Sequence, residues 1–372
     1  MKAVRCPSCG AEMKRNGKTS AGAQRRRCRA CGASTTVFYD DTAARLDEFL
    51  AWLLSKATQA DMPGQGRTFR RLAAAFWPIW PMPESTGEAR RVLFVDGIRL
   101  ARDLVVLIAY DGEHVVSWYM AESETSRAWE ALMAPIPAPD VAVCDGGTGF
   151  ERARRRAWPR ARAQRCLFHA FSQVRRYTTS RPRLQAGREP CALSIELMHL
   201  DTLRRADWWV ERYPRWCSFW ADVLEDAGVV DGRRQYTHER LRRARSSLSR
   251  LVSRGTLFTY LDPALAAEGP LPRTNNPIEG AAHAQLRDML KNHRGMSSTR
   301  RVKAVFWWCY LHTESPRRAS DMLSSMPTDD DIDLLYRVYS ASPKREDGGP
   351  EWGDRAVWEE LHRKDPYPFW LD

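Results

Sequence analysis

The spacing of apolar residues predicts two helices between residues 42 and 81. In the first helix, apolar side chains recur at helical spacing at Leu46, Phe49, Leu50, Leu53 and Leu54. A turn rich in proline and glycine follows at residues 62–66, and a second helix is expected from Arg67 to Trp77. The prolines after this helix predict a linker that reaches Arg91.

Beyond residue 91 the pattern changes to short apolar runs, which predict strands. We expect strands at residues 92–96, 104–110, 114–119, 141–144 and 163–166, and helices at 126–133, at 148–158 and from 168. Asp111-Gly112 is a hairpin turn between the second and third strands. Three antiparallel strands followed by alternating helix and strand predict an α/β fold with a sheet of mixed direction. This is the order of a ribonuclease-H-like core.

Residues 182–272 interrupt that order, because they are rich in tryptophan and arginine and have helical periodicity throughout. We therefore expect a helical insertion. Its clearest helix runs from Arg240 to Arg254 and carries arginines around an apolar face. These arginines form either a solvated face or a contact surface for phosphates, and the candidates are Arg240, Arg242, Arg243 and Arg245.

Charge is unevenly distributed along the chain, whose formal net charge is +12. Residues 1–34 hold nine Lys or Arg and one acidic residue, whereas the chain from Arg317 onward is acidic. A basic front end favours a polyanion as partner, and nucleic acid is the commonest one. Helix, turn and basic helix are similar to a helix-turn-helix, although an ordinary helical hairpin also fits. The candidate DNA contacts at this end are Arg25, Arg26, Arg27, Arg67, Arg70 and Arg71.

Composition excludes two other classes of protein. No apolar stretch is long enough to span a membrane, and the first residues lack the apolar core of a signal peptide, so we expect a cytoplasmic protein. Nine cysteines in 372 residues are too few for a disulfide scaffold.

Four of the cysteines form two Cys-x2-Cys pairs, Cys6 with Cys9 and Cys28 with Cys31, and a glycine follows each pair. Four thiolates on two tight turns match the tetrahedral coordination of zinc. A short segment with few large apolar residues also needs a cross-link, such as a bound metal ion, to fold. We predict one structural Zn²⁺ in a zinc ribbon over residues 1–36; four reduced cysteines without metal are the alternative.

Asp96 and Asp145 each end an apolar strand, where a central sheet exposes its rim. A site for two divalent metal ions needs a further acidic residue, and the candidate is Glu279. Asn276 is expected to cap the helix that carries Glu279, with Pro277 at its first position. The same Asn-x-x-Glu spacing also fits a capping box, in which the glutamate only satisfies a backbone donor.

Together these motifs resemble the Mutator-type DDE transposases of bacterial insertion sequences. The residues that carry the resemblance are Val95-Asp96-Gly97, Cys144-Asp145-Gly146-Gly147, Cys166-Leu-Phe-His169 and Thr274-Asn-Asn-Pro-Ile-Glu279. The resemblance covers roughly residues 91–312. Cys166 and His169 match the Cys-x2-His element of the family. Here His169 is expected to hydrogen-bond a catalytic carboxylate or a DNA phosphate; a metal role for the pair and simple core packing of Cys166 remain alternatives.

The resemblance implies a ribonuclease-H-like core in which Asp96, Asp145 and Glu279 hold two Mg²⁺, or Mn²⁺. It implies hydrolysis at the terminal inverted repeats of a transposon and joining of the 3′-hydroxyl ends to target DNA. It also suggests a homodimer on double-stranded DNA. The expected organisation is a zinc ribbon (1–36), a helix-turn-helix-like segment (42–81), a catalytic core (91–181 and 273–312), a helical insertion (182–272) and an acidic C-terminal region (313–372).

Two other functions fit parts of the pattern. A non-catalytic DNA-binding regulator would need only the ribbon and the basic helices. A nuclease of the ribonuclease-H type would use the carboxylates without joining DNA ends.

Overall fold

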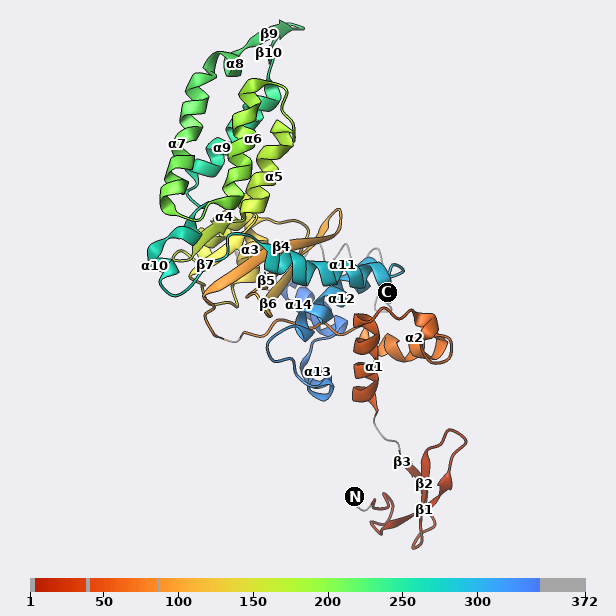
Figure 1. Ribbon diagram of the computed structural model, residues 1–372. Coiled ribbons are helices and arrows are strands. Elements are labelled where there is room, and N and C mark those ends of the chain that lie inside the picture. The colour runs from red at the N-terminus through yellow and green to blue at the C-terminus, as the bar shows by residue number, and fades with distance from the viewer. Residues whose placement is uncertain (1–3, 38–40, 86, 342–372) are drawn as a thin grey trace.

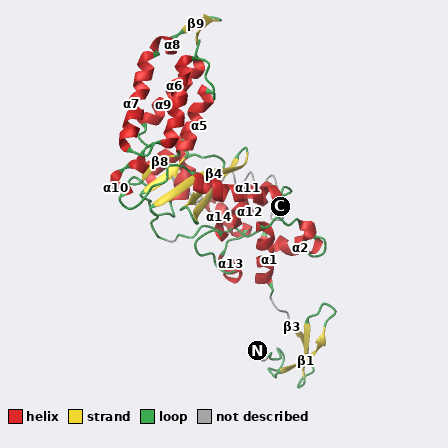
Figure 2. Cartoon of the chain, in the orientation of Figure 1, coloured by secondary structure: helices red, strands yellow, loops and turns green. Residues whose placement is uncertain are grey.

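The computed structural model describes residues 4–37, 41–85 and 87–341 of the chain (Figures 1 and 2). The first range contains a small antiparallel sheet with the strand order β1-β2-β3. Its strands are β1 (Met13–Lys18), β2 (Gln24–Cys28) and β3 (Ser34–Val37). In Figure 1 this sheet lies apart from the other elements, beyond α1.

The two helices predicted next are present, and their apolar faces are buried. α1 (Thr42–Leu54) buries all of its predicted apolar residues except Leu54, which is 41% exposed. α2 (Arg67–Ala73) is shorter than predicted, because the chain tightens into a 3-10 turn at Ala74–Phe76.

Five strands form the central sheet in the order β6-β5-β4-β7-β8. β4 (Val92–Ala101), β5 (Leu104–Tyr110) and β6 (Val115–Ala121) are antiparallel. β7 (Val141–Cys144) is parallel to β4, and β8 (Arg162–Arg165) is parallel to β7. The prediction of an α/β fold with a mixed sheet is therefore confirmed.

Helices cover both faces of this sheet. Successive residues of each strand point to opposite faces, so one strand contributes to the packing on both sides. On one face, Leu93 and Val95 pack in a cluster with side chains of α3 (Ser126–Met133) and α4 (Thr148–Ala157). On the other face, Phe94 packs in a cluster with residues of α11 (His283–Asn292), α12 (Ser298–Leu311) and α1. Asp96 shares the face of Phe94, so its side chain is on the α11 side of the sheet.

The insertion is a helical bundle that extends from one end of the sheet (Figures 1 and 2). Its long helices are α6 (Arg188–Glu196), α7 (Leu203–Phe219) and α9 (Glu239–Ser253), with short helices α8 (Ala221–Glu225) and α10 (Pro263–Ala266). α5 (Leu167–Thr178), which precedes the insertion, packs against α6 and α9 in the same bundle. The prediction that the insertion is helical throughout is wrong, because it also contains two strands. β9 (Ala227–Val230) and β10 (Arg233–Tyr236) form a hairpin, since Asp231 and Gly232 both have positive φ, as a tight two-residue turn requires.

The bundle leaves the sheet and returns to it at adjacent points. The backbone N–H of Arg165 donates to the carbonyl of Thr256 over 2.8 Å, and that of Leu167 donates to the carbonyl of Arg273 over 3.0 Å. The chain segments on either side of the insertion are therefore held together before the candidate glutamate at residue 279.

A buried ion pair fastens the acidic region to the core. Lys303 on α12 lies 2.6 Å from Asp329, the first residue of α14 (Asp329–Ala341), and both side chains are 0% exposed. Trp80 in the predicted linker donates its indole N–H to the same carboxylate, and the carbonyl of Trp77 accepts from Lys303. α13 (Ala319–Ser325) also contributes Met322 to the core. Residues 342–372 of the predicted acidic region lie outside the described part.

No helix in the described ranges is long and apolar enough to cross a membrane.

Candidate active site

Two strands bring Asp96 and Asp145 to the same level of the sheet. In the parallel pair, Phe94 on β4 is opposite Val143 on β7. Each aspartate comes two residues after its member of that pair, so both carboxylates reach the same sheet edge on the same face. Asp96 accepts a hydrogen bond from the Gly97 N–H at 2.9 Å, and Asp145 accepts one from the Gly147 N–H at 2.8 Å.

Glu279 reaches this edge from a π-helical turn, Pro277–Ala282, which runs directly into α11. The prediction that Asn276 caps this helix is wrong, because Asn276 itself has helical backbone angles and its side chain makes no capping hydrogen bond. Asn275 fixes the start of the turn instead. Its backbone N–H donates to Cys166 Sγ at 3.2 Å, and its side-chain amide donates to the carbonyl of Val95 at 3.3 Å. The turn is thus attached beside Asp96.

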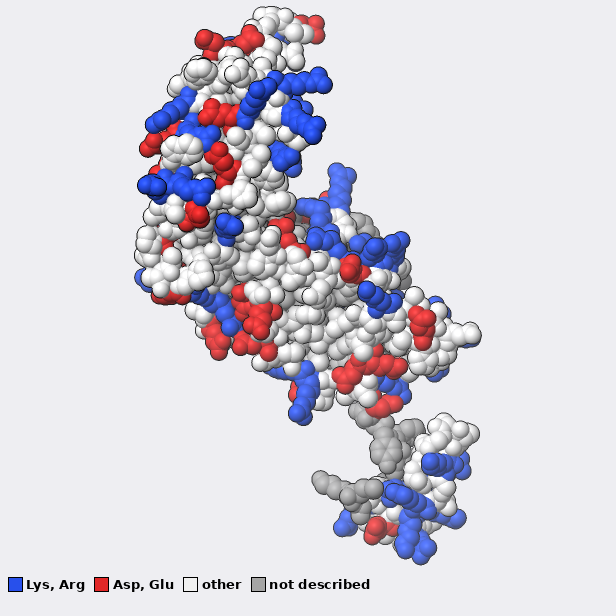
Figure 3. Space-filling model, in the orientation of Figure 1, with Lys and Arg blue, Asp and Glu red and all other residues white. Residues whose placement is uncertain are grey.

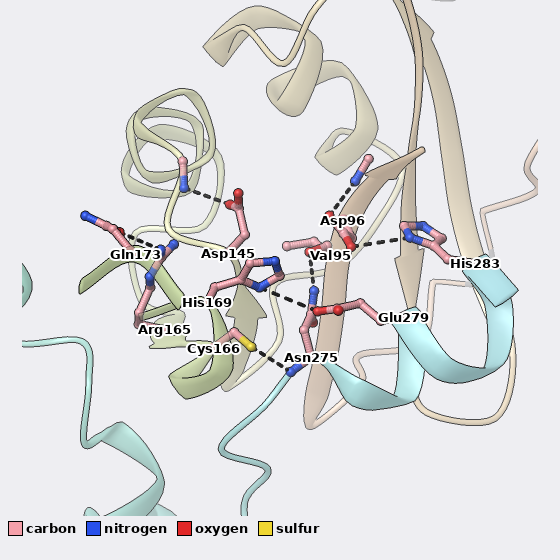
Figure 4. A network of polar contacts seen from close by, with 12 residues as sticks. Val95, Asp96, Asp145, Arg165, Cys166, His169, Gln173, Asn275, Glu279 and His283 are labelled. Atoms are coloured by element: carbon pink, nitrogen blue, oxygen red, sulfur yellow. Dashed lines mark hydrogen bonds and ion pairs between the residues drawn. The ribbon is translucent and has the colours of Figure 1, made fainter. Parts of the chain in front are cut away.

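Asp96, Asp145, Glu279 and His169 face a common space (Figure 4). Burial, together with the charges of Asp145 and Glu279, raises the pKa of Asp96 to about 7, against the lowering effect of the Gly97 N–H. Carboxylates that repel one another in a partly buried site are suited to a divalent cation, which would remove the repulsion. Carboxylate oxygens are the ligands that Mg²⁺ prefers, but the ligand atoms of Asp96, Asp145 and Glu279 do not all lie within 4.8 Å of one another.

The raised pKa of Asp96 predicts a pH effect on the stability of the metal-free protein. Because the folded-state pKa is above the unfolded value, the folded protein binds the proton more tightly, and stability falls as pH rises from about 4 to about 7. Asp96→Asn should therefore raise the melting temperature at pH 8 in EDTA and have little effect at pH 4. An equal melting temperature for the two proteins at pH 8 would contradict the raised pKa.

His169 lies between the two strand ends and the glutamate. Its Nδ1 is 3.5 Å from Glu279 Oε1, and both atoms are buried without a hydrogen-bond partner in the described ranges. The ligand atoms of Cys166, His169 and Glu279 all lie within 4.8 Å of one another. His169 thus contacts a candidate catalytic carboxylate, one of the roles expected from the sequence, and a metal role for these three residues also fits.

Two residues near Asp96 were missed in the sequence. His283 is 3% exposed, and its Nδ1 is 3.3 Å from Asp96 Oδ2. Burial lowers the pKa of His283 to about 4, so it is neutral near pH 7. Glu124, which follows β6, raises the pKa of Asp96 through its charge. A signal for His283 was available, since it stands four residues after Glu279 and one helical turn separates the two.

Asp145 has a basic neighbour, Arg165, whose side chain donates to Gln173 Oε1 at 3.1 Å. Gly146 allows this approach, because a Cβ at that position would lie 2.1 Å from Arg165 Nη1 and the φ of Gly146 is +80°. The Asp145-Gly146 sequence therefore positions both a carboxylate and a guanidinium.

The four N-terminal cysteines gather at one point of the small sheet. The distances from Cys6 Sγ to Cys31 Sγ and from Cys9 Sγ to Cys28 Sγ are both 3.5 Å. Thiolates around a tetrahedral zinc ion lie about 3.8 Å apart, so the cluster fits zinc. The pKa values of the four thiols differ: a hydrogen bond from the Ser8 backbone lowers the pKa of Cys6, whereas the pKa of Cys9 is raised to about 12.

We expect Cys28→Ser to reduce bound zinc from one ion per chain to none, because three thiolates rarely retain a structural ion. The central sheet should remain folded, since β1, β2 and β3 form a separate sheet. Elemental analysis and circular dichroism would measure the two effects. Cys191→Ser, which changes a buried cysteine in α6, is the matched control. Zinc-free wild-type protein with an intact ribbon would refute the prediction.

The predicted DNA contacts occupy three separate places. Arg25, Arg26 and Arg27 lie on β2, and Arg67, Arg70 and Arg71 are exposed on α2. On α9, the cations are engaged with protein groups: Arg242 and Arg245 pair with Glu225, Arg243 pairs with Glu239, and Arg240 donates to the carbonyl of Arg176. Phosphate binding at α9 would have to compete with these contacts.

The chain was compared with curated proteins and with models of protein families. No curated protein matches the chain. Residues 101–229 match the family model described as "Transposase, Mutator family". The matched range includes Asp145 and His169, whereas Asp96 and Glu279 lie on either side of it. This part of the chain is therefore similar to Mutator-family transposases, which supports a transposase role.

Proposed function

We propose that the protein is a DDE transposase of a bacterial insertion sequence. The observation that carries the proposal is the convergence of Asp96, Asp145 and Glu279 from two parallel strands and a π-helical turn. The segment that matches the Mutator family lies between Asp96 and Glu279 in the sequence. The strand order and the helical insertion support a ribonuclease-H-like core. On this reading, residues 91–181 and 273–312 form the catalytic unit.

The three carboxylates would hold two Mg²⁺, for which Mn²⁺ can substitute. When bound, these ions activate the attacking oxygen and stabilise the leaving oxygen of the phosphodiester. The protein supplies positioning. His283 holds the Asp96 carboxylate on one side, and His169 contacts Glu279 on the other. Arg165 places a positive charge beside Asp145, where a DNA phosphate could be held.

Two further elements would bind the terminal inverted repeats. The zinc ribbon carries Arg25, Arg26 and Arg27, and the helix-turn-helix-like segment of residues 42–81 exposes Arg67, Arg70 and Arg71. Cleavage and joining of two transposon ends would require a homodimer or a larger assembly on double-stranded DNA in the cytoplasm.

A plasmid assay tests the proposal and separates it from its alternatives. The substrate is a supercoiled plasmid that carries the DNA flanking the gene, with Mg²⁺ and, as a control, with EDTA. A transposase cuts at inverted repeats and joins the ends to a second plasmid. A ribonuclease-H-type nuclease would cut without joining, and a DNA-binding regulator would leave the plasmid intact.

A further inference from the structure

We propose that a basic groove beside Asp96 holds the backbone of the DNA strand that is cut, next to the scissile phosphate. This inference rests on the proposed function and adds a binding site to it. The groove is a cavity of about 490 Å³ between β4, α11 and the start of α12. Its lining is Gly97, Ile98, Arg99, His283, Arg287, Leu290, Lys291, Arg294 and Arg301.

The lining is positively charged and contains no carboxylate. None of its five cations is in an ion pair with a residue of the described ranges. The arginines of α9 differ in this respect, since Glu225 and Glu239 neutralise three of them. Cations that are not in an ion pair give the groove a positive potential that attracts anions.

Figure 3 shows this charge as Lys and Arg side chains gathered over α11. Arg287 and Lys291 are one helical turn apart on that helix, and Arg99 approaches from β4. Cations that converge from separate elements suit an extended polyanion better than a single small anion. The apolar Ile98 and Leu290 between them offer surface for sugars or bases.

The groove is continuous with the carboxylates. Gly97 lines it and donates its backbone N–H to Asp96, and His283 lines it and contacts Asp96 with Nδ1. Arg287 donates to the backbone carbonyl of Glu279 at 3.3 Å, which ties this cation to the π-helical turn that carries the third carboxylate. A strand with one phosphate at the carboxylates would therefore have its neighbouring phosphates over the groove.

The test variant is Lys291→Gln/Arg301→Gln. Both side chains line the groove, and neither makes a hydrogen bond or an ion pair with a described residue. The probe is a short DNA duplex of arbitrary sequence, bound at several salt concentrations in EDTA. We expect the slope of log affinity against log salt to become shallower by about 1.8, since two phosphate contacts are lost. We also expect Mg²⁺-dependent plasmid cleavage to fall at least about tenfold.

The matched control is Arg156→Gln/Arg215→Gln, which removes the same charge at exposed positions on α4 and α7. Its salt slope and cleavage rate should equal those of the wild type. Equal melting temperatures for both variants would show that they are folded.

Three results would overturn the inference. The salt slope of the groove variant could equal that of the wild type, or the control variant could lower it equally. Normal cleavage with loss of end joining alone would assign the groove to target DNA instead. If the wild-type protein cuts no plasmid, the proposed function fails. DNA binding in the groove still stands in that case if the groove variant, and not the control variant, has a shallower salt slope.

Discussion

Glu279→Gln is expected to abolish Mg²⁺-dependent DNA cleavage, with a loss of at least about a thousandfold. Glutamine has the size of glutamate and keeps a side-chain oxygen near His169, but it brings no negative charge to a divalent cation. The protein should still fold and bind DNA. Plasmid cleavage, DNA binding and thermal unfolding of the variant measure these effects separately.

The capping-box interpretation already lacks its Asn276 hydrogen bond in the structure. This substitution tests what remains of it, because glutamine would be almost silent if Glu279 only satisfied a backbone donor. Asp96→Asn and Asp145→Asn should abolish cleavage to the same extent. A double variant should be no worse than either single variant, because residues that hold the same metal ions act as a unit. The matched control is Glu268→Gln, which changes a glutamate whose side chain is 74% exposed. Cleavage by Glu279→Gln within a few-fold of wild type would show that another acidic residue, such as Glu124, completes the site.

Asp329→Ala is expected to destabilise the protein by about 3–5 kcal/mol, because it leaves the buried Lys303 ammonium without a counterion. Trp80 would lose its hydrogen-bond acceptor at the same time. Burial already lowers the pKa of Lys303 to about 8, so the unpaired lysine would lose its proton more readily. Chemical denaturation would measure the loss in free energy of unfolding.

A double variant provides the control for this ion pair. Lys303→Met/Asp329→Asn removes both charges, and the asparagine oxygen still accepts from the Trp80 indole. It should be more stable than Asp329→Ala, because no unpaired charge remains in the core. Asp330→Ala changes the adjacent exposed acidic residue and should have little effect. If Asp329→Ala is as stable as Asp330→Ala, the ion pair does not anchor α14.

The sequence predicted the elements whose patterns are local. The strand Leu104–Tyr110, the helix Ser126–Met133 and the strand Val141–Cys144 have the predicted bounds. β4 is longer than predicted, because pairing with β5 continues beyond Asp96 to Ala101. The hairpin in the insertion was missed although Asp231-Gly232 is a turn signal, because the surrounding arginines and tryptophans gave a stronger helical pattern.

Contacts between residues far apart in the sequence were harder to predict. The two aspartates could be predicted at one sheet edge, because parallel strands end together. The π-helical turn could not, since it depends on Asn275 reaching Cys166 and Val95 from far along the chain. The same holds for the contact of His283 with Asp96 and for the Lys303–Asp329 pair. Spacing along the sequence does not determine which polar side chains become buried together.

The adjacent exit and return points of the insertion have a consequence for variation in length. Hydrogen bonds from Arg165 to Thr256 and from Leu167 to Arg273 hold the ends of the loop, whatever lies farther out in the bundle. Closing a loop costs entropy that grows only logarithmically with its length, about 0.6 kcal/mol for each doubling. The outer bundle, including the β9–β10 hairpin, is therefore free to lengthen, shorten or accept a fused domain, while the spacing of the three carboxylates stays constant.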